Sequence, residues 1–123
     1  MLCLTVAMSN GVTAAAPPEV ERTPLNRIDV NPSRPTEVVV SRLVVQPGGM
    51  VPPHTHPGVE TAYVIAGSRT EIWKQGERDL QPGEMLTFPE GQVHGLKVVG
   101  KKPLILLTIH IVVKDEPMVR PAP

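Results

Sequence analysis

Aromatic residues are scarce in this chain of 123 residues, which contains one Phe, one Tyr and one Trp. Its core must therefore be built from Val, Leu, Ile and Met, and a site that stacks sugar rings is not expected. The single cysteine, Cys3, excludes an internal disulfide bond. Twelve basic residues balance twelve acidic ones, and no basic patch is interleaved with aromatic residues, so nucleic acid is not an expected partner.

Long hydrophobic runs are missing as well, so no membrane span is expected. The N-terminal segment 1–16 contains a short apolar run, Leu2–Met8, followed by the small residues Ala14–Ala16. This order is typical of the later part of a secretory signal peptide, one with a truncated beginning because no Lys or Arg precedes the apolar run. We therefore expect a periplasmic or secreted protein, and the alternative is a cytoplasmic protein with a disordered Ala-rich tail.

Proline and glycine are abundant, with 15 and 10 residues, and they separate short apolar runs. No segment of the body shows sustained helical periodicity. We expect strands at eight places, namely 36–45, 50–56, 60–66, 69–74, 78–80, 85–88, 94–99 and 104–113. Many short strands separated by Gly and Pro turns predict an all-β sandwich or barrel.

The two flanks of this β domain, which covers 36–113, differ from it in composition. Residues 17–35 are rich in Pro and charge, which is typical of an extended arm, and Ile28 and Val30 could add a short edge strand. Residues 114–123 are polar and Pro-rich and are expected to form a flexible tail. The strand 104–113 is apolar on both faces, so we expect it to be covered in a homodimer, with 104–113 or 20–30 at the interface.

One stretch, Gly48–Gly67, places His54, His56 and Glu60 within seven residues. Side chains two apart in a strand point to the same side, so the two imidazoles should project together. The Pro and Gly between His56 and Glu60 favour a bend that returns the carboxylate to the same point. Two imidazoles and a carboxylate that converge can bind a divalent transition metal. The alternative is a set of polar residues on a solvated loop, since short motifs often match by chance.

Two glycine-punctuated motifs carry a resemblance to a known family. The first, Gly48–Gly67, has the spacing G-x5-H-x-H-x3-E-x6-G, and the second, Gly83–His94, has the spacing G-x5-P-x-G-x2-H. In this order and at this separation they resemble the two motifs of small single-domain cupins. The resemblance implies a double-stranded β-helix, or jelly-roll, barrel over about 36–113. One departure is Val98, where the second motif usually ends in Asn, which leaves the neighbouring turn or pocket rim open to question.

The resemblance also implies that His54, His56, Glu60 and His94 ligate one metal ion. Such a donor set leaves two neighbouring coordination positions open for water, dioxygen or a chelating substrate, and it does not choose among Fe, Mn, Ni, Co, Cu and Zn. By analogy with the family, the expected function is a metal-dependent oxygenase or oxidase of dioxygenase type that acts on a small chelating substrate. Glu60 could also act as a base. The alternatives are a metal-dependent isomerase or lyase and a non-catalytic cupin that binds a small ligand.

Other residues are candidates for the pocket or for contact with the substrate. Tyr63 lies close to Glu60 in sequence and could line the pocket, or it could pack in the core with its hydroxyl at a rim. Met50 and Phe88 are expected in the core or the pocket wall. Arginines could contact an anionic substrate, but lone arginines usually face water; those considered are Arg42, Arg69 and Arg78.

His110 alternates with apolar residues and Thr108 along the strand 104–113. A surface or interface position is the commoner outcome for such a histidine. The alternative is a position inside the barrel, beside the metal ligands or the substrate.

Overall fold

The computed structural model describes residues 19–31 and 35–123, so the expected signal peptide over 1–16 lies outside the described residues. The described residues form ten strands, in chain order β1 Val20–Asn31, β2 Thr36–Val45, β3 Met50–Thr55, β4 Gly58–Ala66, β5 Arg69–Ile72, β6 Gly76–Asp79, β7 Met85–Phe88, β8 His94–Val98, β9 Leu104–Val113 and β10 Arg120–Pro121. A membrane-crossing helix is absent from these two ranges.

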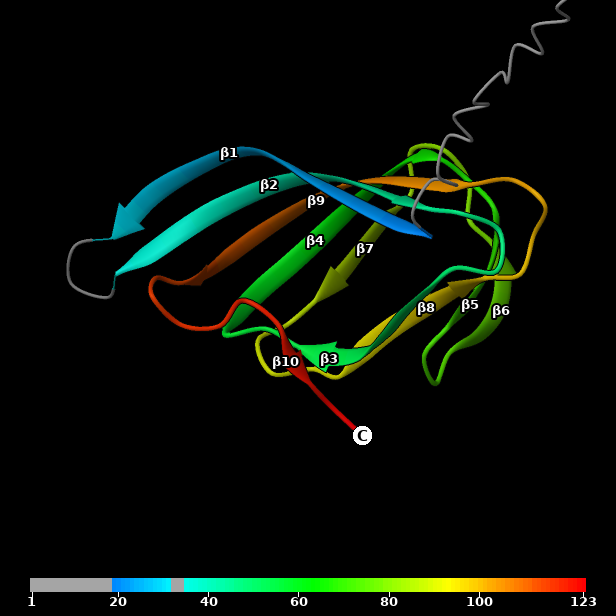
Figure 1. The fold of residues 1–123 in the computed structure, drawn as a ribbon. Coiled ribbons are helices and arrows are strands. Elements are labelled where there is room, and N and C mark those ends of the chain that lie inside the picture. The colour runs from blue at the N-terminus through cyan, green and yellow to red at the C-terminus, as the bar shows by residue number, and fades with distance from the viewer. Residues whose placement is uncertain (1–18, 32–34) are drawn as a thin grey trace, which may run out of the picture.

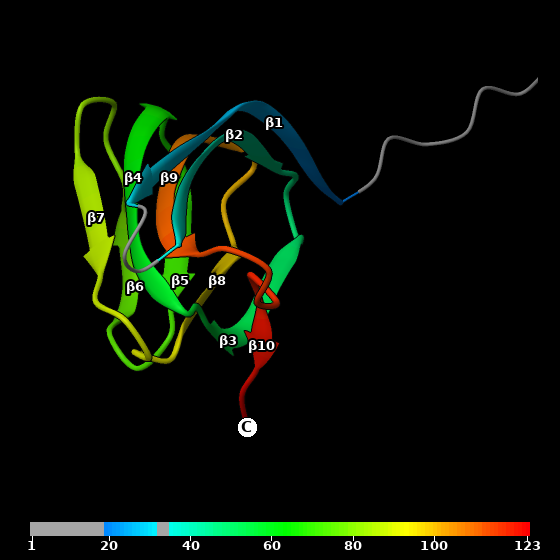
Figure 2. The same ribbon diagram turned by 90° about the vertical axis from the view of Figure 1, so that its left-hand side faces the viewer.

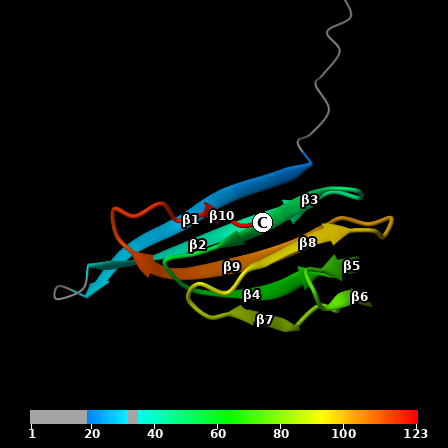
Figure 3. The same cartoon turned by 90° about the horizontal axis from the view of Figure 1, so that it is seen from below.

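The strands form two five-stranded antiparallel sheets that face each other (Figure 1). Sheet A has the order β1-β2-β9-β4-β7, and sheet B has the order β10-β3-β8-β5-β6. Figure 2 shows sheet A arched over sheet B, and Figure 3 shows that the strands of both sheets run in similar directions. Because β9 lies between β2 and β4, strands distant in sequence are neighbours in space, as in a jelly-roll barrel. The expected all-β jelly-roll fold is therefore confirmed.

The central strand of sheet A is β9, which pairs with β2 over its full length and with β4 on its other side. Alternate residues of β9, from Leu104 to Val112, are buried toward sheet B. Together with inward residues of both sheets they form an aliphatic core, in which each fully buried side chain contributes about 1.5–3 kcal/mol. The core cluster contains Leu43, Val45, Ala62, Val64, Ile72, Leu80, Leu86, Phe88, Val98, Leu104 and Leu106.

Both flanks are more regular than the sequence predicts. β1 is an edge strand of 12 residues and pairs with β2 through most of its length, where only a short edge strand is expected. The segment 114–123, expected as a flexible tail, contains β10, which pairs with β3 through Arg120 opposite Thr55 and Pro121 opposite His54. The C-terminal segment therefore lies against the strand that carries His54.

The turn between β2 and β3 does not depend on the Asn that Val98 replaces. Gly48 has a φ of 80°, which favours glycine. The Gly48 N–H donates to the Val98 carbonyl at 2.9 Å, and the Val98 N–H donates to the Gly49 carbonyl at 3.0 Å. Val98 itself is completely buried in the core. Backbone hydrogen bonds therefore hold this turn, and an aliphatic side chain fills the space beside it.

The outward side of sheet A carries an apolar surface, which we call the outer face of sheet A. On β9 its residues Ile105, Leu107 and Ile109 are half-buried between neighbouring strands. Larger exposed fractions, from 40% to 53%, belong to residues around them, namely Val59, Tyr63, Ile65, Met85 and Ile111. A contiguous apolar surface of this kind is typical of an interaction site.

Candidate metal centre

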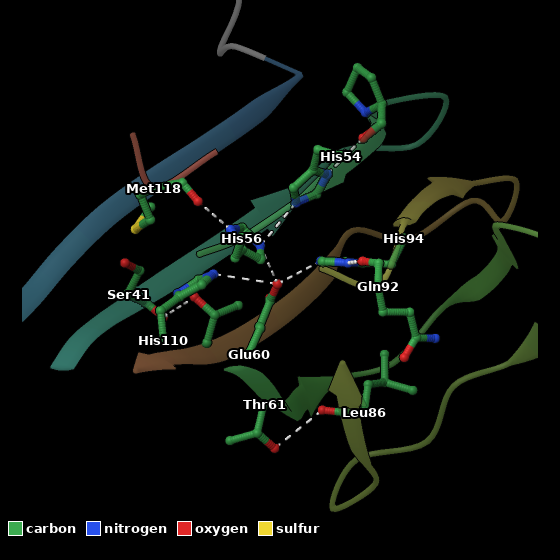
Figure 4. A network of polar contacts seen from close by, with 12 residues as sticks. Ser41, His54, His56, Glu60, Thr61, Leu86, Gln92, His94, His110 and Met118 are labelled. Carbon is green, nitrogen blue, oxygen red and sulfur yellow. Dashed lines mark hydrogen bonds and ion pairs between the residues drawn. The ribbon is translucent and has the colours of Figure 1, made fainter. Parts of the chain in front are cut away.

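Three histidines and one glutamate converge between the two sheets (Figure 4). His54 lies near the end of β3, His56 follows that strand directly, Glu60 lies in β4 and His94 begins β8. One ligand atom from each residue lies within 4.8 Å of the ligand atoms of the other three. All four residues are buried, with exposed fractions of 3–7%. These residues, which we call the ligand group, could hold a metal ion.

Strand pairing explains why residues far apart in sequence meet here. His54 lies directly opposite His94 in the pairing of β3 with β8, and a register irregularity precedes this pair. Glu60 lies opposite His110 on one side of β4 and opposite Phe88 on the other. Because cross-strand partners point to the same face, these pairs project their side chains into the barrel. Each sheet therefore supplies part of the ligand group.

The three imidazoles of the ligand group are oriented by backbone carbonyls. The Nδ1 atom of His54 lies 2.8 Å from the Pro52 carbonyl oxygen, and Nδ1 of His94 lies 2.9 Å from that of Gln92. Nδ1 of His56 lies 2.5 Å from the carbonyl oxygen of Met118, in the C-terminal segment. A carbonyl can only accept, so each Nδ1 carries a hydrogen and donates it. In the neutral ring the Nε2 atom then has a free lone pair.

These lone pairs point at one another and at a carboxylate oxygen. Nε2 of His54 and Nε2 of His56 are 3.1 Å apart. Oε2 of Glu60 is 2.9 Å from Nε2 of both His56 and His94. Polar atoms this close need a positive charge among them, either protons shared between the rings and the carboxylate or a metal ion. A divalent metal supplies that charge, and imidazole nitrogen with carboxylate oxygen is a donor set that transition metals accept.

The pKa directions in the ligand group favour a metal over added protons. Burial lowers the pKa of His54, because the charged ring loses its hydration, so this ring resists protonation. Burial alone would raise the pKa of Glu60, but the nearby imidazoles of His110, His56 and His94 lower it far below its ordinary value. A neutral imidazole and an ionised carboxylate are the states in which these side chains bind metals.

His110 is a fifth polar side chain at the ligand group. It is completely buried, its ring centroid lies 4.6 Å from that of His56, and its Nε2 atom lies 3.4 Å from Oε2 of Glu60. Neither ring nitrogen has a hydrogen-bond partner among the described residues. The surface or interface position favoured by the sequence is therefore wrong, and the alternative position inside the barrel is the one observed. Its strand is apolar on both faces, so the sequence alone does not tell which face is inward.

A small cavity of about 20 Å³ adjoins the ligand group. Phe88 forms part of its wall and stacks on His94, with ring centroids 4.1 Å apart and planes 6° from parallel. Phe88 therefore lies where the sequence predicts. Most of the remaining wall is aliphatic, and includes Leu43, Val51, Ile72 and Leu86. The cavity is only a little larger than the minimum that a single water molecule needs, which is about 10–15 Å³.

Two residues proposed for the pocket lie elsewhere. Tyr63 is 42% exposed on the outer face of sheet A, because it is three residues from Glu60 and side chains alternate along β4. Met50 is 51% exposed and lines a groove on the outside of sheet B with Trp73 and Lys97. Neither residue reaches the cavity beside the ligand group.

The arginine that lines the cavity is not one of the three that the sequence suggests. Arg69 is half-exposed beside Glu77, and Arg78 is half-exposed beside Glu84. Arg42 is exposed as well. Arg22, on β1, instead lines the cavity together with His54, Glu60 and His94. The sequence contains no signal for this contact, since β1 comes to the barrel only through its pairing with β2.

Comparisons with known proteins agree with this arrangement. Residues 41–110 match the family described as "Cupin domain". The chain is 35% identical over 108 residues to germin-like protein subfamily 2 member 2 of Arabidopsis thaliana, a match that covers 82% of this chain and 44% of that protein. It is 36% identical over 70 residues to a germin-like protein of Ipomoea nil, covering 52% and 33%. The chain thus spans less than half the length of these relatives.

Solved structures share the fold over most of the chain. A Klebsiella pneumoniae protein with a double-stranded β-helix domain is 25% identical with a TM-score of 0.66, covering 95% of this chain and 84% of that one. The polyketide cyclase RemF of Streptomyces resistomycificus is also 25% identical, with a TM-score of 0.63 and coverage of 85% and 71%. With two cupin motifs in the sequence, a jelly-roll barrel and a family match over most of that barrel, the chain belongs to the cupin family.

Proposed function

We propose that this chain binds one divalent transition metal through His54, His56, Glu60 and His94, and that it acts on a small chelating substrate as a metal-dependent oxygenase or oxidase. The observation that supports metal binding most strongly is the convergence of three Nε2 lone pairs and a carboxylate oxygen within 4.8 Å. The donor set admits Fe, Mn, Ni, Co, Cu or Zn. When bound, such a metal polarises a substrate oxygen or, if it is redox-active, exchanges electrons with the substrate and dioxygen.

The residues of the chain would orient the substrate and exclude water. Stacking on Phe88 and the hydrogen bond to the Gln92 carbonyl hold the His94 ring in one orientation. The aliphatic wall leaves little room for bulk water beside the ligand group. A dry site strengthens electrostatic contacts with the substrate and protects reactive species from hydrolysis.

Glu60 has a second role in this proposal, as a base that takes a proton from the substrate. Its lowered pKa makes the carboxylate a weak base while it contacts His56 and His94. Proton transfer therefore requires the carboxylate to turn away from these rings. His110, whose Nε2 atom lies 3.4 Å from the same oxygen, is placed to receive a hydrogen bond from or donate one to Glu60 during such a movement.

A reaction without redox change is the second candidate. The similarity to the polyketide cyclase RemF favours it, because the two chains share the fold at 25% identity. In that case the chain would be a metal-dependent isomerase or lyase. A non-catalytic cupin that holds a small ligand is the remaining alternative.

Elemental analysis of the natively purified protein, followed by oxygen uptake, tests these functions. We expect about one metal ion per chain, and loss of it in His54→Ala and His56→Ala. Iron, manganese, nickel or copper that supports oxygen uptake with a diketone, enediol, catechol or thiol chelator would favour the oxygenase. Zinc without uptake would favour the second candidate. Wild-type protein that remains metal-free after incubation with each metal would refute metal binding.

We further propose that the protein is a homodimer that associates through the outer face of sheet A. Support comes from the exposed apolar residues on this face, among them Ile65 and Ile111. A C2 interface requires one self-complementary surface, which an apolar face of this kind can supply. Export to the periplasm or the outside remains a proposal that rests on the sequence of residues 1–16.

A further inference from the structure

Arg22 enters the barrel from the edge of sheet A. In the pairing of β1 with β2, Arg22 lies opposite Leu43, a core residue that is 3% exposed. Paired residues of neighbouring strands share a face, so the Arg22 side chain points inward with Leu43. Arg22 is accordingly one of the residues that line the cavity, together with His54, Glu60 and His94.

The guanidinium of Arg22 is incompletely satisfied in this position. Its Nη1 atom is buried and has no hydrogen-bond partner in the described part of the chain. Arginine remains charged at every physiological pH, so a proton cannot be removed to relieve this cost. A buried donor without a partner costs about 1–3 kcal/mol, and more when the group is charged. An ionised acceptor brought by a ligand would remove that cost.

The charge of the cavity also favours a negative ligand. Glu60 supplies one negative charge, which a divalent ion bound by the ligand group would outweigh. Arg22 adds a further positive charge on the same cavity wall. Opposite charges in a site of low polarity attract more strongly than they do in water, so a small anion should be drawn to the space between Arg22 and the ligand group.

Size and wall chemistry narrow the anion to a carboxylate. The cavity of about 20 Å³ has room for little more than one small group, so a planar carboxylate can reach Arg22 more easily than a bulkier tetrahedral phosphate. A carboxylate can also accept two parallel hydrogen bonds from a guanidinium. The hydrocarbon body must be short and apolar, because the aliphatic side chains of the wall, such as Ile72 and Leu86, have to move apart to admit it.

We infer that the natural ligand is a small carboxylic acid with an apolar body, whose carboxylate pairs with Arg22 and whose neighbouring oxygen lies at the metal ligand group. This inference rests on the proposed metal binding and adds the substrate class to it. It assigns a ligand-binding role to Arg22.

Calorimetric titration of the full-length, zinc-loaded protein with pyruvate tests the inference. Pyruvamide, which has nearly the same shape but no charge, is the matched probe, and inorganic phosphate is the second anion. The variants are Arg22→Met, which keeps the length of the side chain, and Arg22→Lys, which keeps the charge but not the planar fork. Arg78→Met serves as the control, because Arg78 is half-exposed and bonded to Glu84 outside the cavity.

We expect the wild type and Arg78→Met to bind pyruvate and to bind pyruvamide much more weakly. Arg22→Met should bind pyruvate roughly 10- to 100-fold more weakly, as is usual for loss of a hydrogen bond to a charged group. Arg22→Lys should lie between them. Pyruvate should also raise the melting temperature of the wild type and not that of Arg22→Met, whose ligand-free form should be no less stable because it has lost a buried unpaired donor.

The results separate this inference from the proposed function. Equal pyruvate affinity in wild type and Arg22→Met, at equal zinc content, would overturn the role of Arg22 and leave metal binding intact. Arg22-dependent binding of phosphate without binding of pyruvate would overturn the carboxylate assignment, and so would wild-type protein that holds zinc and binds neither probe. Wild-type protein that holds no zinc would overturn both proposals. If Arg22→Met does not fold, Arg22→Lys decides the question. A pyruvate affinity of Arg22→Lys equal to that of the wild type overturns the pairing of the carboxylate with two N–H groups of the guanidinium.

Discussion

Removal of one of the four metal-binding side chains should abolish the stabilisation of the protein by zinc. A ligand that binds only the folded state stabilises it by about 2.7 kcal/mol when its concentration is one hundred times Kd. For a domain of 123 residues this corresponds to a rise in Tm of about 10 °C. The perturbation is His94→Ala, which removes one of the four donor side chains. We expect the zinc-dependent rise in Tm to be nearly lost in this variant.

His94→Ala also has a cost that is unrelated to metal binding. The ring stacks on Phe88 with centroids 4.1 Å apart, and an aromatic contact of this kind contributes about 0.5–1.5 kcal/mol. The Tm of the metal-free variant should therefore fall as well. For this reason the quantity to compare is the difference in Tm with and without zinc, measured by differential scanning calorimetry. Phe88→Leu is the matched control, because it removes the stacking and keeps all four ligands.

Phe88→Leu should lower the Tm of the metal-free protein and retain most of the zinc-dependent rise. If His94→Ala keeps the full rise while its zinc content equals that of the wild type, His94 is not a ligand and the four-donor arrangement is refuted. A rise that disappears equally in both variants would show that packing around His94, and not its coordination, controls zinc binding.

Acidification should destabilise the metal-free protein, because His54 and Glu60 have lower pKa values in the folded state than in the unfolded chain, which therefore takes up protons first. In denaturant unfolding, the free energy of unfolding should fall by up to about 1.4 kcal/mol per pH unit below pH 6.5 because of His54. It should fall further below about pH 4.5 because of Glu60. Constant stability between pH 6.5 and 5 would contradict the burial of a neutral His54. Ile111→Lys, on the outer face of sheet A, should yield a monomer in light scattering with unchanged zinc content, and a monomeric wild type at tens of micromolar would refute the dimer. Deletion of 117–123 removes the carbonyl that orients His56, so zinc affinity in a competition titration should fall about 10- to 100-fold, and an unchanged affinity would exclude that role.

The sequence predicts the ligand group well because local rules and one resemblance agree. His54 and His56 are two apart in an extended segment, and a Pro-Gly bend leads back to Glu60. These three residues need no knowledge of the remaining chain. His94 lies 34 residues after Glu60, and only the resemblance to the cupin motifs identifies it as a further ligand. The strands between them follow from Gly and Pro spacing, and β2, β7 and β9 have the predicted bounds.

Contacts made through edge strands are harder to predict from one sequence. Arg22 reaches the cavity because β1 pairs with β2 in a particular register, and a shift of one residue would turn it outward. Met118 contributes only its backbone carbonyl, so its side chain carries no signal for that contact. His110 is ambiguous for a related reason, because its strand is apolar on both faces and alternation alone does not identify the inward one. Tyr63 differs, since alternation along β4 from an inward Glu60 already places it on the outer face.

The division of the ligand group between two sheets has a mechanical consequence. Glu60 comes from sheet A and His94 from sheet B, and 34 residues separate them along the chain. An ion held by both would cross-link the sheets as a disulfide does in other small domains, and closing a loop of that length removes about 4 kcal/mol of chain entropy from the unfolded state. This chain, with its single cysteine, would thus have a reversible metal cross-link in place of a covalent disulfide. Chelators would break that cross-link and reducing agents would not.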